Sequence, residues 1–258
     1  MSESRLIFGT ASVGSRTSYS EFSKSALLAC SLGVKVFDTA PIYGRGLAQK
    51  YLSKFIAENP DLGIKVITKV GRVIKFDLKT LMVYLLRLDF SPIASGLVCL
   101  RGTDFSLSNE NISRTKKEIY KRFDSGRVLN ILVHSPDRNI INAEVLSELD
   151  ETFKFNLPVG CSDPEMNHFK QFHAHCNTNF MVQVGYEEFL KRPDLQAHSG
   201  HLVVNGILRF SKHYGIPLQD LFHKIDRMRG GKQTSFNFGF YSREVVSDIF
   251  SAYGDYSA

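Results

Sequence analysis

The chain has 258 residues, of which 43% are hydrophobic, and its formal net charge is +6. This length suits one α/β barrel or two small domains, and the hydrophobic fraction allows a large buried core. No run approaches the ~20 apolar residues of a membrane span, residues 1–5 lack the pattern of a signal peptide, and no long basic run indicates nucleic-acid binding.

The first half of the chain alternates short apolar runs with helix-spaced patterns. Segment 72–110 is long and irregular, with Pro92 and Gly96 in its middle. Because loops of this length usually serve a function, we interpret it as either a lid-like insertion or extra structure over a functional site. Strands are expected over 6–10, 34–37, 64–69 and 128–133, and helices over 21–32, 47–56 and 111–123.

The second half keeps the same alternation, with eight strand candidates in all. Strands are expected over 157–161, 180–184, 201–204 and 235–240, and helices over 143–153, 164–175, from near Leu208, and over 244–250. Strand–helix alternation favours parallel pairing, so we predict a single-domain (β/α)8 TIM barrel spanning 1–258. A doubly wound open sheet is the alternative, which is weakened because no Gly-x-Gly-x-x-Gly follows a strand.

Polar side chains stand where three of the predicted strands end. Asp38 and Tyr43 follow the second strand, Lys69 closes the third, and His134 closes the fourth. If these strands are neighbours in a barrel, the four groups meet at its carboxyl-end face, where such barrels keep their chemistry. Taken singly they have plainer interpretations, namely a turn residue, a half-buried aromatic, a solvated charge and a hydrogen-bonded strand end.

These residues belong to longer motifs. The motifs are Phe37-Asp38-Thr39-Ala40 with Tyr43-Gly44, Thr68-Lys69-Val70-Gly71-Arg72, and Leu132-Val133-His134-Ser135-Pro136-Asp137. With them the chain resembles the aldo-keto reductase family nearly from end to end. Residues 44–48, 69–72 and 103–106 are most similar to its aldose (galactose/fucose-type) dehydrogenase and pyridoxal dehydrogenase branch.

The resemblance implies hydride transfer between NADP, or NAD, and a small carbonyl or sugar substrate. Tyr43 would be the general acid in reduction and the base in oxidation. At ~4 Å an ammonium and a phenolate attract by roughly 4 kcal/mol, so Lys69 is expected to lower the pKa of Tyr43 into a useful range. Asp38 would hold Lys69 charged and oriented, and His134 would bind the substrate oxygen.

The resemblance also implies a cofactor site on the later strands. Ser162, Asp163 and Gln183 would bind the nicotinamide carboxamide, and Ser242 and Arg243 could bind a phosphate at a helix start. An N-cap and a surface charge are the plainer interpretation of Ser242 and Arg243. Arg243 and the basic balance favour NADP slightly over NAD.

The chain departs from the family pattern at several positions. Asp163 stands where Asn is usual, Asn205 replaces an aromatic residue that stacks on the nicotinamide, and Gln49 replaces a Glu, which leaves its helix less anchored. The connection from Asn205 to Ser235 is short for the family's loop over the pyrophosphate. The alternative function is therefore a degenerate barrel that binds dinucleotides weakly or not at all and acts as a binding or regulatory module.

Cysteine and histidine spacing adds no metal site. The four cysteines form no CxxC pair, and a reduced, cytoplasmic protein is expected. His168, His173 and His175 lie on or near one predicted helix, but no carboxylate completes a metal triad. We interpret them as surface histidines. Neither the oligomeric state nor the identity of the substrate follows from the sequence.

Overall fold

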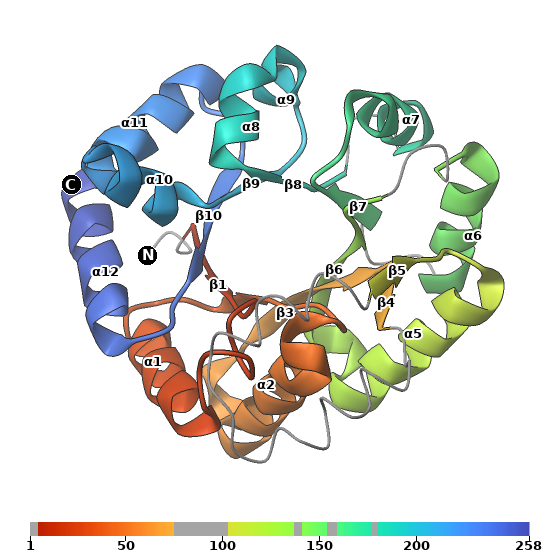
Figure 1. Ribbon diagram of the computed structural model, residues 1–258, viewed down its shortest axis with the longest axis horizontal. Coiled ribbons are helices and arrows are strands. Elements are labelled where there is room, and N and C mark those ends of the chain that lie inside the picture. Colours follow the sequence, from red (N-terminus) through yellow and green to blue (C-terminus); the bar gives the residue numbers. More distant parts are fainter. Residues whose placement is uncertain (1–4, 75–102, 137–140, 154–158, 177–179, 258) are drawn as a thin grey trace.

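The structure, a computed structural model, describes residues 5–74, 103–136, 141–153, 159–176 and 180–257. Eight parallel strands form a closed barrel in the order β1-β10-β9-β8-β7-β6-β3-β2, and the helices surround it (Figure 1). The predicted TIM barrel is confirmed, and the open sheet is excluded. The strands are β1 (Leu6–Gly9), β2 (Val36–Asp38), β3 (Lys65–Val70), β6 (Val128–His134), β7 (Val159–Ser162), β8 (Val182–Gly185), β9 (Leu202–Asn205) and β10 (Thr234–Gly239).

The outer layer follows the predicted helices, with several differences. The helices are α1 (Tyr19–Ser31), α2 (Leu47–Glu58), α5 (Asn109–Arg122), α6 (Ala143–Phe153), α7 (Met166–Cys176), α8 (Tyr186–Lys191), α9 (Pro193–Ala197), α10 (Ile207–Tyr214), α11 (Leu218–Arg229) and α12 (Arg243–Ser257). Single 3-10 turns cover Tyr43–Gly46, Pro60–Leu62 and Ser125–Arg127. Helices α8 and α9 were not predicted, and α12 is longer than the segment 244–250 expected for it.

The predicted insertion is described only at its two flanks. There β4 (Arg72–Ile74) and β5 (Thr103–Phe105) pair in antiparallel fashion, and Asn109 begins α5. The flanks are therefore more regular than the irregular segment we expected. Residues 75–102 lie outside the described part of the chain, so the extent of the insertion stays a prediction.

Local sequence explains where α1 begins and which face it buries. Ser18 is extended and caps the helix, while the Glu21 carboxylate accepts from the Ser18 backbone N–H at 2.9 Å. This reciprocal pair satisfies backbone donors that the first helical turn leaves unpaired. Phe22, Ala26 and Ala29, spaced by three and four residues, are all buried against the barrel.

The core has two parts, one outside the barrel and one inside it. Between strands and helices, phenylalanine rings pack in contact, as in the stacked pair Phe8 and Phe37, whose centres are 4.8 Å apart. Inside the barrel a separate apolar cluster crosses the axis. Its members, here called the apolar layer, are Ile7, Ile67, Leu132, Met181 and Val203.

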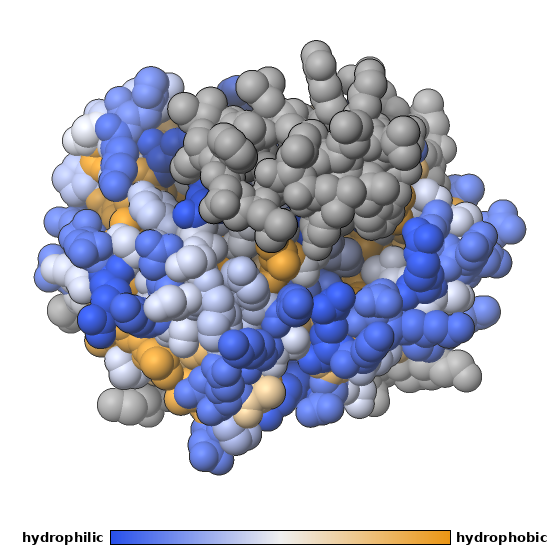
Figure 2. Space-filling view, turned by 60° about the horizontal axis from the view of Figure 1, so that its bottom comes forward, coloured by the Kyte–Doolittle hydropathy of each residue, from blue (hydrophilic) through white to orange (hydrophobic). Residues whose placement is uncertain are grey.

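The face that carries α1, α2 and α5 is mostly hydrophilic over its described residues (Figure 2). Figure 2 brings α1, α2 and α5 forward and shows apolar side chains there in small separate patches. Over the described residues, no helix combines the length and apolar character that a membrane crossing requires.

The histidine interpretation needs a correction. His168 on α7 is only 2% exposed, so it is not a surface residue. It lies on the inward face of α7, which packs against the barrel. His175 is half-buried and pairs with Asp150 at 2.9 Å. Within the described ranges, no group of three or more His, Cys, Asp or Glu side chains is placed to hold a metal ion.

Candidate active site

A buried ion pair lies at the carboxyl end of the barrel. Lys69 on β3 points inward, and its Nζ lies 2.5 Å from Asp38 Oδ1 at the end of β2. Both side chains are almost fully buried, at 0% and 3% exposure, so Lys69 is not the solvated charge of the plainer interpretation. Burial disfavours the charge on Lys69, but Asp38 and Tyr43 outweigh it and raise the pKa of Lys69.

Tyr43 stands over this ion pair. The chain turns sharply after Tyr43, at Gly44, whose φ is +53°. Gly44 also packs so closely that a Cβ there would lie 2.2 Å from the Val13 carbonyl oxygen. This turn holds the Tyr43 ring with Lys69 Nζ 5.0 Å from its centre. Lys69 therefore faces the ring of the residue that it is expected to assist.

The pKa of Tyr43 differs from our expectation. Burial raises it to about 12, even though the positive charge of Lys69 lowers it. The Coulomb argument omitted the loss of hydration, which disfavours the phenolate more than Lys69 favours it. The expectation that Lys69 brings the pKa toward neutrality is therefore wrong for the free protein, and Tyr43 is a protonated donor at pH 7.

His134 ends β6 beside Tyr43. The two rings are nearly perpendicular at 89°, with centres 5.6 Å apart. Burial, helped by the positive charges of Lys69 and Arg72, holds the pKa of His134 well below its ordinary value. The imidazole is therefore neutral at pH 7, and its buried Nδ1 has no hydrogen-bond partner among the described residues.

Two of the predicted cofactor residues continue this row. In the barrel register His134 pairs with Ser162, and Ser162 pairs with Gln183. Because parallel neighbours in register lie side by side, these three side chains from β6, β7 and β8 line one sector of the barrel mouth. The structure thus brings Asp38, Tyr43, Lys69, His134, Ser162 and Gln183 to one end of the molecule.

A comparison with protein families bears directly on this arrangement. The model described as "Aldo/keto reductase family" matches residues 5–219, most of the chain. The chain belongs to the aldo/keto reductase family.

Solved structures share its fold at low sequence identity. The glycerol dehydrogenase AKR11B4 from Gluconobacter oxydans is 15% identical, with a TM-score of 0.71 over 97% of this chain and 86% of that one. The aldo-keto reductase AKR11C1 from Bacillus halodurans, in its holo form, is 17% identical, with a TM-score of 0.68 over 96% and 86%. An aldo/keto reductase from Klebsiella pneumoniae in complex with NADP and acetate is 16% identical, with a TM-score of 0.62 over 96% and 85%. No curated protein matches the chain.

One observation tests whether this aldo/keto reductase could hold a nicotinamide. Gln183 is 3% exposed, and its Oε1 is buried without a hydrogen-bond partner in the described part of the chain. Such an orphaned acceptor carries a free-energy penalty of about 1–3 kcal/mol unless a donor reaches it. A carboxamide N–H of a bound nicotinamide is a suitable donor, so the residues present fit the group.

Asp163 follows Ser162 in a left-handed conformation, with a φ of +51°. Asp and Asn are the non-glycine residues that tolerate this conformation best, so Asp163 suits the turn as well as the Asn expected there would. The Asp163 carboxylate accepts from the hydroxyls of Ser135 and Ser162, each at 3.4 Å. Desolvation raises the pKa of Asp163, while Lys69 and these hydroxyls lower it.

Ser242 and Arg243 lie at the start of α12. The Ser242 hydroxyl accepts from the Val245 backbone N–H at 3.4 Å, so it serves as the N-cap. Arg243 is exposed. This placement matches the plainer interpretation of Ser242 and leaves only Arg243 and the helix end to meet a phosphate.

Gln49 was misjudged from the sequence, and Asn237 was missed. Gln49 is buried and donates to the Thr68 hydroxyl at 3.0 Å, so α2 is anchored to β3, contrary to our expectation. Asn237 on β10 donates from Nδ2 to Asp38 Oδ2 at 3.1 Å. The signal for Asn237 was a lone amide between Phe236 and Phe238 in a strand otherwise rich in buried aromatics.

The connection between β9 and β10 contains α10 and α11, where the sequence indicated a helical stretch from near Leu208. That it is short for the family's loop over the pyrophosphate stays a prediction. Asn205 ends β9 opposite Gly185 of β8. That Asn205 replaces a stacking aromatic residue of the family stays a prediction.

Proposed function

We propose that this protein is an NAD(P)-dependent oxidoreductase that interconverts an aldehyde, ketone or sugar with its alcohol or lactone. The observation that carries the proposal is the fully buried Lys69–Asp38 pair below Tyr43. A buried ion pair is a poor source of stability, whereas a fixed ammonium beside a phenol serves proton transfer directly. Membership of the aldo/keto reductase family supports NAD(P)-dependent carbonyl reduction.

Each member of the group has a distinct task in this proposal. Tyr43 gives its proton to the oxygen of the carbonyl being reduced, and the charge of Lys69 stabilises the phenolate that remains. Asp38 keeps Lys69 protonated. The neutral His134 donates one ring N–H to the substrate oxygen and orients it. A bound nicotinamide would supply or accept the hydride.

The cofactor and substrate class are proposed on weaker grounds. Gln183 and Ser162 would orient the carboxamide, with Asp163 fixing the Ser162 hydroxyl, and Arg243 at the start of α12 favours NADP over NAD. Sugars and polyols of the aldose dehydrogenase type are the substrates that we propose to screen first. A cytoplasmic location remains a prediction, supported by the buried free thiols of Cys30 and Cys161.

The test is a titration of the purified protein with NADPH and NADH, followed by nicotinamide fluorescence and a screen of aldoses and aldehydes. We expect micromolar binding of one dinucleotide and turnover of at least one carbonyl compound. Tyr43→Phe should retain the dinucleotide affinity but lose turnover by more than about a hundredfold, because general acid catalysis contributes ~10²–10⁴-fold. Near-intact turnover of this variant would contradict the proposed role of Tyr43 as the general acid.

A degenerate barrel that binds another ligand is the second candidate. The hollow of about 410 Å³ beside the ends of β7, β8 and β9 favours it, because the side chains that line it include four carboxylates but only two cations. Such a wall repels a polyanion such as a dinucleotide. Absence of binding up to millimolar NADPH and NADH would support this candidate over the oxidoreductase.

A further inference from the structure

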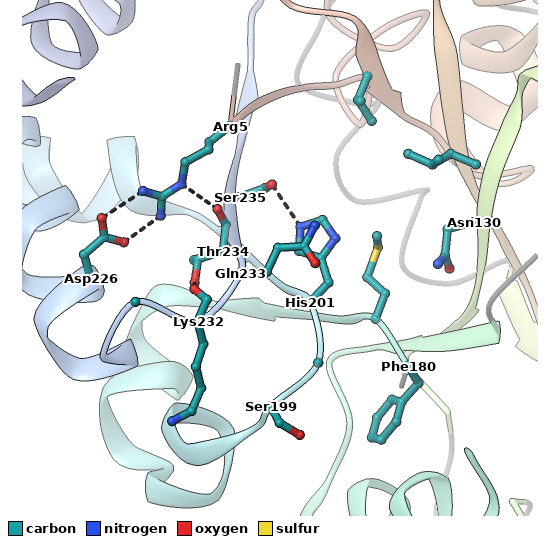
Figure 3. A pocket seen from close by; sticks show the side chains of 15 residues that line it. Arg5, Asn130, Phe180, Ser199, His201, Asp226, Lys232, Gln233, Thr234 and Ser235 are labelled. Carbon is teal, nitrogen blue, oxygen red and sulfur yellow. Dashed lines mark hydrogen bonds and ion pairs between the residues drawn. The ribbon is translucent and has the colours of Figure 1, made fainter. Parts of the chain in front are cut away.

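A second pocket lies at the opposite, amino end of the barrel. It has a volume of about 730 Å³ and is lined by residues from the starts of the strands and the loops before them. Figure 3 shows Asn130, His201 and Ser235 around it, with Arg5 at one side. Pockets that hold metabolites typically span ~300–1,000 Å³, so a ligand of that size fits.

The apolar layer separates this pocket from the candidate active site. Along β6, successive inward side chains are Asn130, Leu132 and His134. Asn130 lines the amino-end pocket, Leu132 belongs to the apolar layer, and His134 faces the barrel mouth. The two polar ends are thus divided by close-packed hydrocarbon side chains, and a ligand at one end does not reach the other.

The walls of the pocket are held in place from behind. Arg229, which is 0% exposed, donates to the carbonyl oxygens of Gly200 at 2.9 Å and Gln233 at 3.1 Å, and both of these residues line the pocket. Arg5 is fixed by the Asp226 carboxylate at 2.6 Å and the Thr234 carbonyl oxygen at 2.7 Å. Fixed walls lower the ordering cost of binding.

The charge around the pocket is positive. Arg5 and Lys232 line it together with a single carboxylate, Asp226. Arg229 behind the wall adds a cation that, among the described residues, donates to carbonyl and hydroxyl oxygens rather than to carboxylates. Burial first, and then the charges of Arg229 and Arg5, lower the pKa of His201 to about 4, so this ring is neutral at pH 7.

Polar groups suited to a ligand face the same space. Asn130 is 1% exposed, and its Oδ1 has no hydrogen-bond partner within the described ranges. The hydroxyl of Ser199 and the amide of Gln233 lie on the rim. An isolated buried amide inside a barrel is costly, and a ligand that bonds to it offsets that cost.

We propose that the amino-end pocket binds a small organic anion, one that carries a carboxylate or phosphate group on a polar body. Arg5, Lys232 and Arg229 give the site its positive charge, and Asn130 bonds to the polar body. His201 stays neutral and completes the wall through its 2.9 Å bond to the Ser235 hydroxyl. This site is independent of the oxidoreductase reaction proposed above.

The test is a calorimetric titration of the full chain with citrate and with inorganic phosphate, with glycerol as the uncharged control. Lys232→Glu is compared with Lys224→Glu, because both lysines are exposed and only Lys232 lines the pocket. We expect at least one anion to bind, Lys232→Glu to weaken it about tenfold or more (~1.4 kcal/mol), and Lys224→Glu to bind as the parent does. Which anion binds identifies the group recognised.

Three results would overturn the proposal. The first is no heat with either anion up to about 10 mM, and the second is equal weakening by the two lysine variants. The third is weakening by Arg243→Glu to the same degree as by Lys232→Glu, which would place the anion at the start of α12. Asn130→Leu, checked for folding by its melting temperature, should also weaken binding, since it removes the buried amide without changing charge.

Discussion

The two oxygens of Asp38 are held by different strands. Oδ1 accepts from Lys69 on β3, and Oδ2 accepts from Asn237 on β10. The Asp38 backbone carbonyl also accepts from the Thr10 hydroxyl at 2.9 Å. The position of Lys69 therefore depends on a carboxylate that the second, third and last strands of the barrel fix together, with Asn237 as a positioning residue.

Asn237→Ala should lower kcat with little change in KM, because it frees one oxygen of Asp38 without touching substrate. A loss of about tenfold is expected, the equivalent of one hydrogen bond to a charged group at ~1.5 kcal/mol. Gly9→Ala should act similarly, since its Cβ would lie 2.6 Å from Asn237 Oδ1 and displace the amide.

The two changes should not add, because they disturb the same bond. Steady-state kinetics of the single and double variants measure this coupling. Gly126→Ala is the matched control, as its Cβ would meet no atom within 4 Å. Additive losses would show that Gly9→Ala does not act through the bond between Asn237 and Asp38.

The raised pKa of Tyr43 has different consequences for the two directions of the proposed reaction. Reduction needs the phenol, which is the populated form up to the pKa of about 12, so its rate should be flat between pH 6 and 9. Oxidation needs the phenolate, so its rate should rise about tenfold per pH unit over the same interval. Initial rates in both directions measure this, and an oxidation rate that falls with pH would contradict it.

The sequence was informative about the residues at strand ends. Asp38, Lys69 and His134 were predictable because a polar residue that ends a buried strand of a parallel barrel lies at the barrel mouth. Asn237 was missed because an amide in the middle of a strand resembles a solvent-facing position. The direction of the Tyr43 pKa shift was not predictable, since burial and Lys69 act in opposite directions and only the fold sets their balance.

At the scale of elements, Arg229 joins three parts of the chain. From the end of α11 its guanidinium donates to the carbonyl oxygens of Leu195 and Gln196, each at 3.2 Å, which belong to α9. It also reaches the loop before β9 and the start of β10. A buried Arg is favourable only where its donors are satisfied, and here backbone carbonyls satisfy them.

Arg229→Met should destabilise the fold by roughly 3 kcal/mol or more, because several buried carbonyl oxygens lose their donor at ~1–3 kcal/mol each. Arg227→Met, on the same helix but exposed, should change stability by less than about 0.5 kcal/mol. Urea unfolding measures both. Equal stability of the two variants would mean that water replaces the Arg229 bonds.

Element type was predictable where the pattern was long. Helices α1, α2, α5 and α6 each bury a face with helical spacing over three turns or more. Helices α8 and α9 have six and five residues, too few for a period to show. Pro193 begins α9, and a proline there is equally typical of a loop.

At the scale of the whole molecule, β1 and β10 close the barrel, and α11 and α12 cover the seam. Arg5 at the start of β1 pairs with Asp226 of α11 at 2.6 Å and bonds to the Tyr256 hydroxyl of α12. Partial burial opposes the charge of Asp226, but the bonds from Arg5 and Tyr256 outweigh it and lower the pKa of Asp226.

Because this pKa is lower in the folded than in the unfolded protein, the stabilisation is present above about pH 4, the ordinary Asp value, and is lost as the pH falls further. Asp226→Asn should lower the free energy of unfolding by about 1 kcal/mol at pH 7, discounted because the pair is partly exposed. At pH 3 the difference should shrink. Denaturant midpoints of Asp226→Asn and the exposed control Asp248→Asn measure this, and a constant difference at both pH values would contradict it.

The closed barrel was the most predictable feature, since eight alternating units leave few other architectures. The amino-end pocket was not predictable, because Asn130, His201 and Ser235 are far apart in sequence and carry no shared motif. Only barrel closure brings them together.

The apolar layer also affects how this protein can change over generations. A substitution at the mouth and one at the amino end share no contacts across those hydrocarbon side chains, so their effects should add. Mutations can then alter the substrate preference or the second pocket separately, because a change at one end needs no compensating change at the other. A laboratory selection for new substrates would therefore require substitutions at the barrel mouth alone.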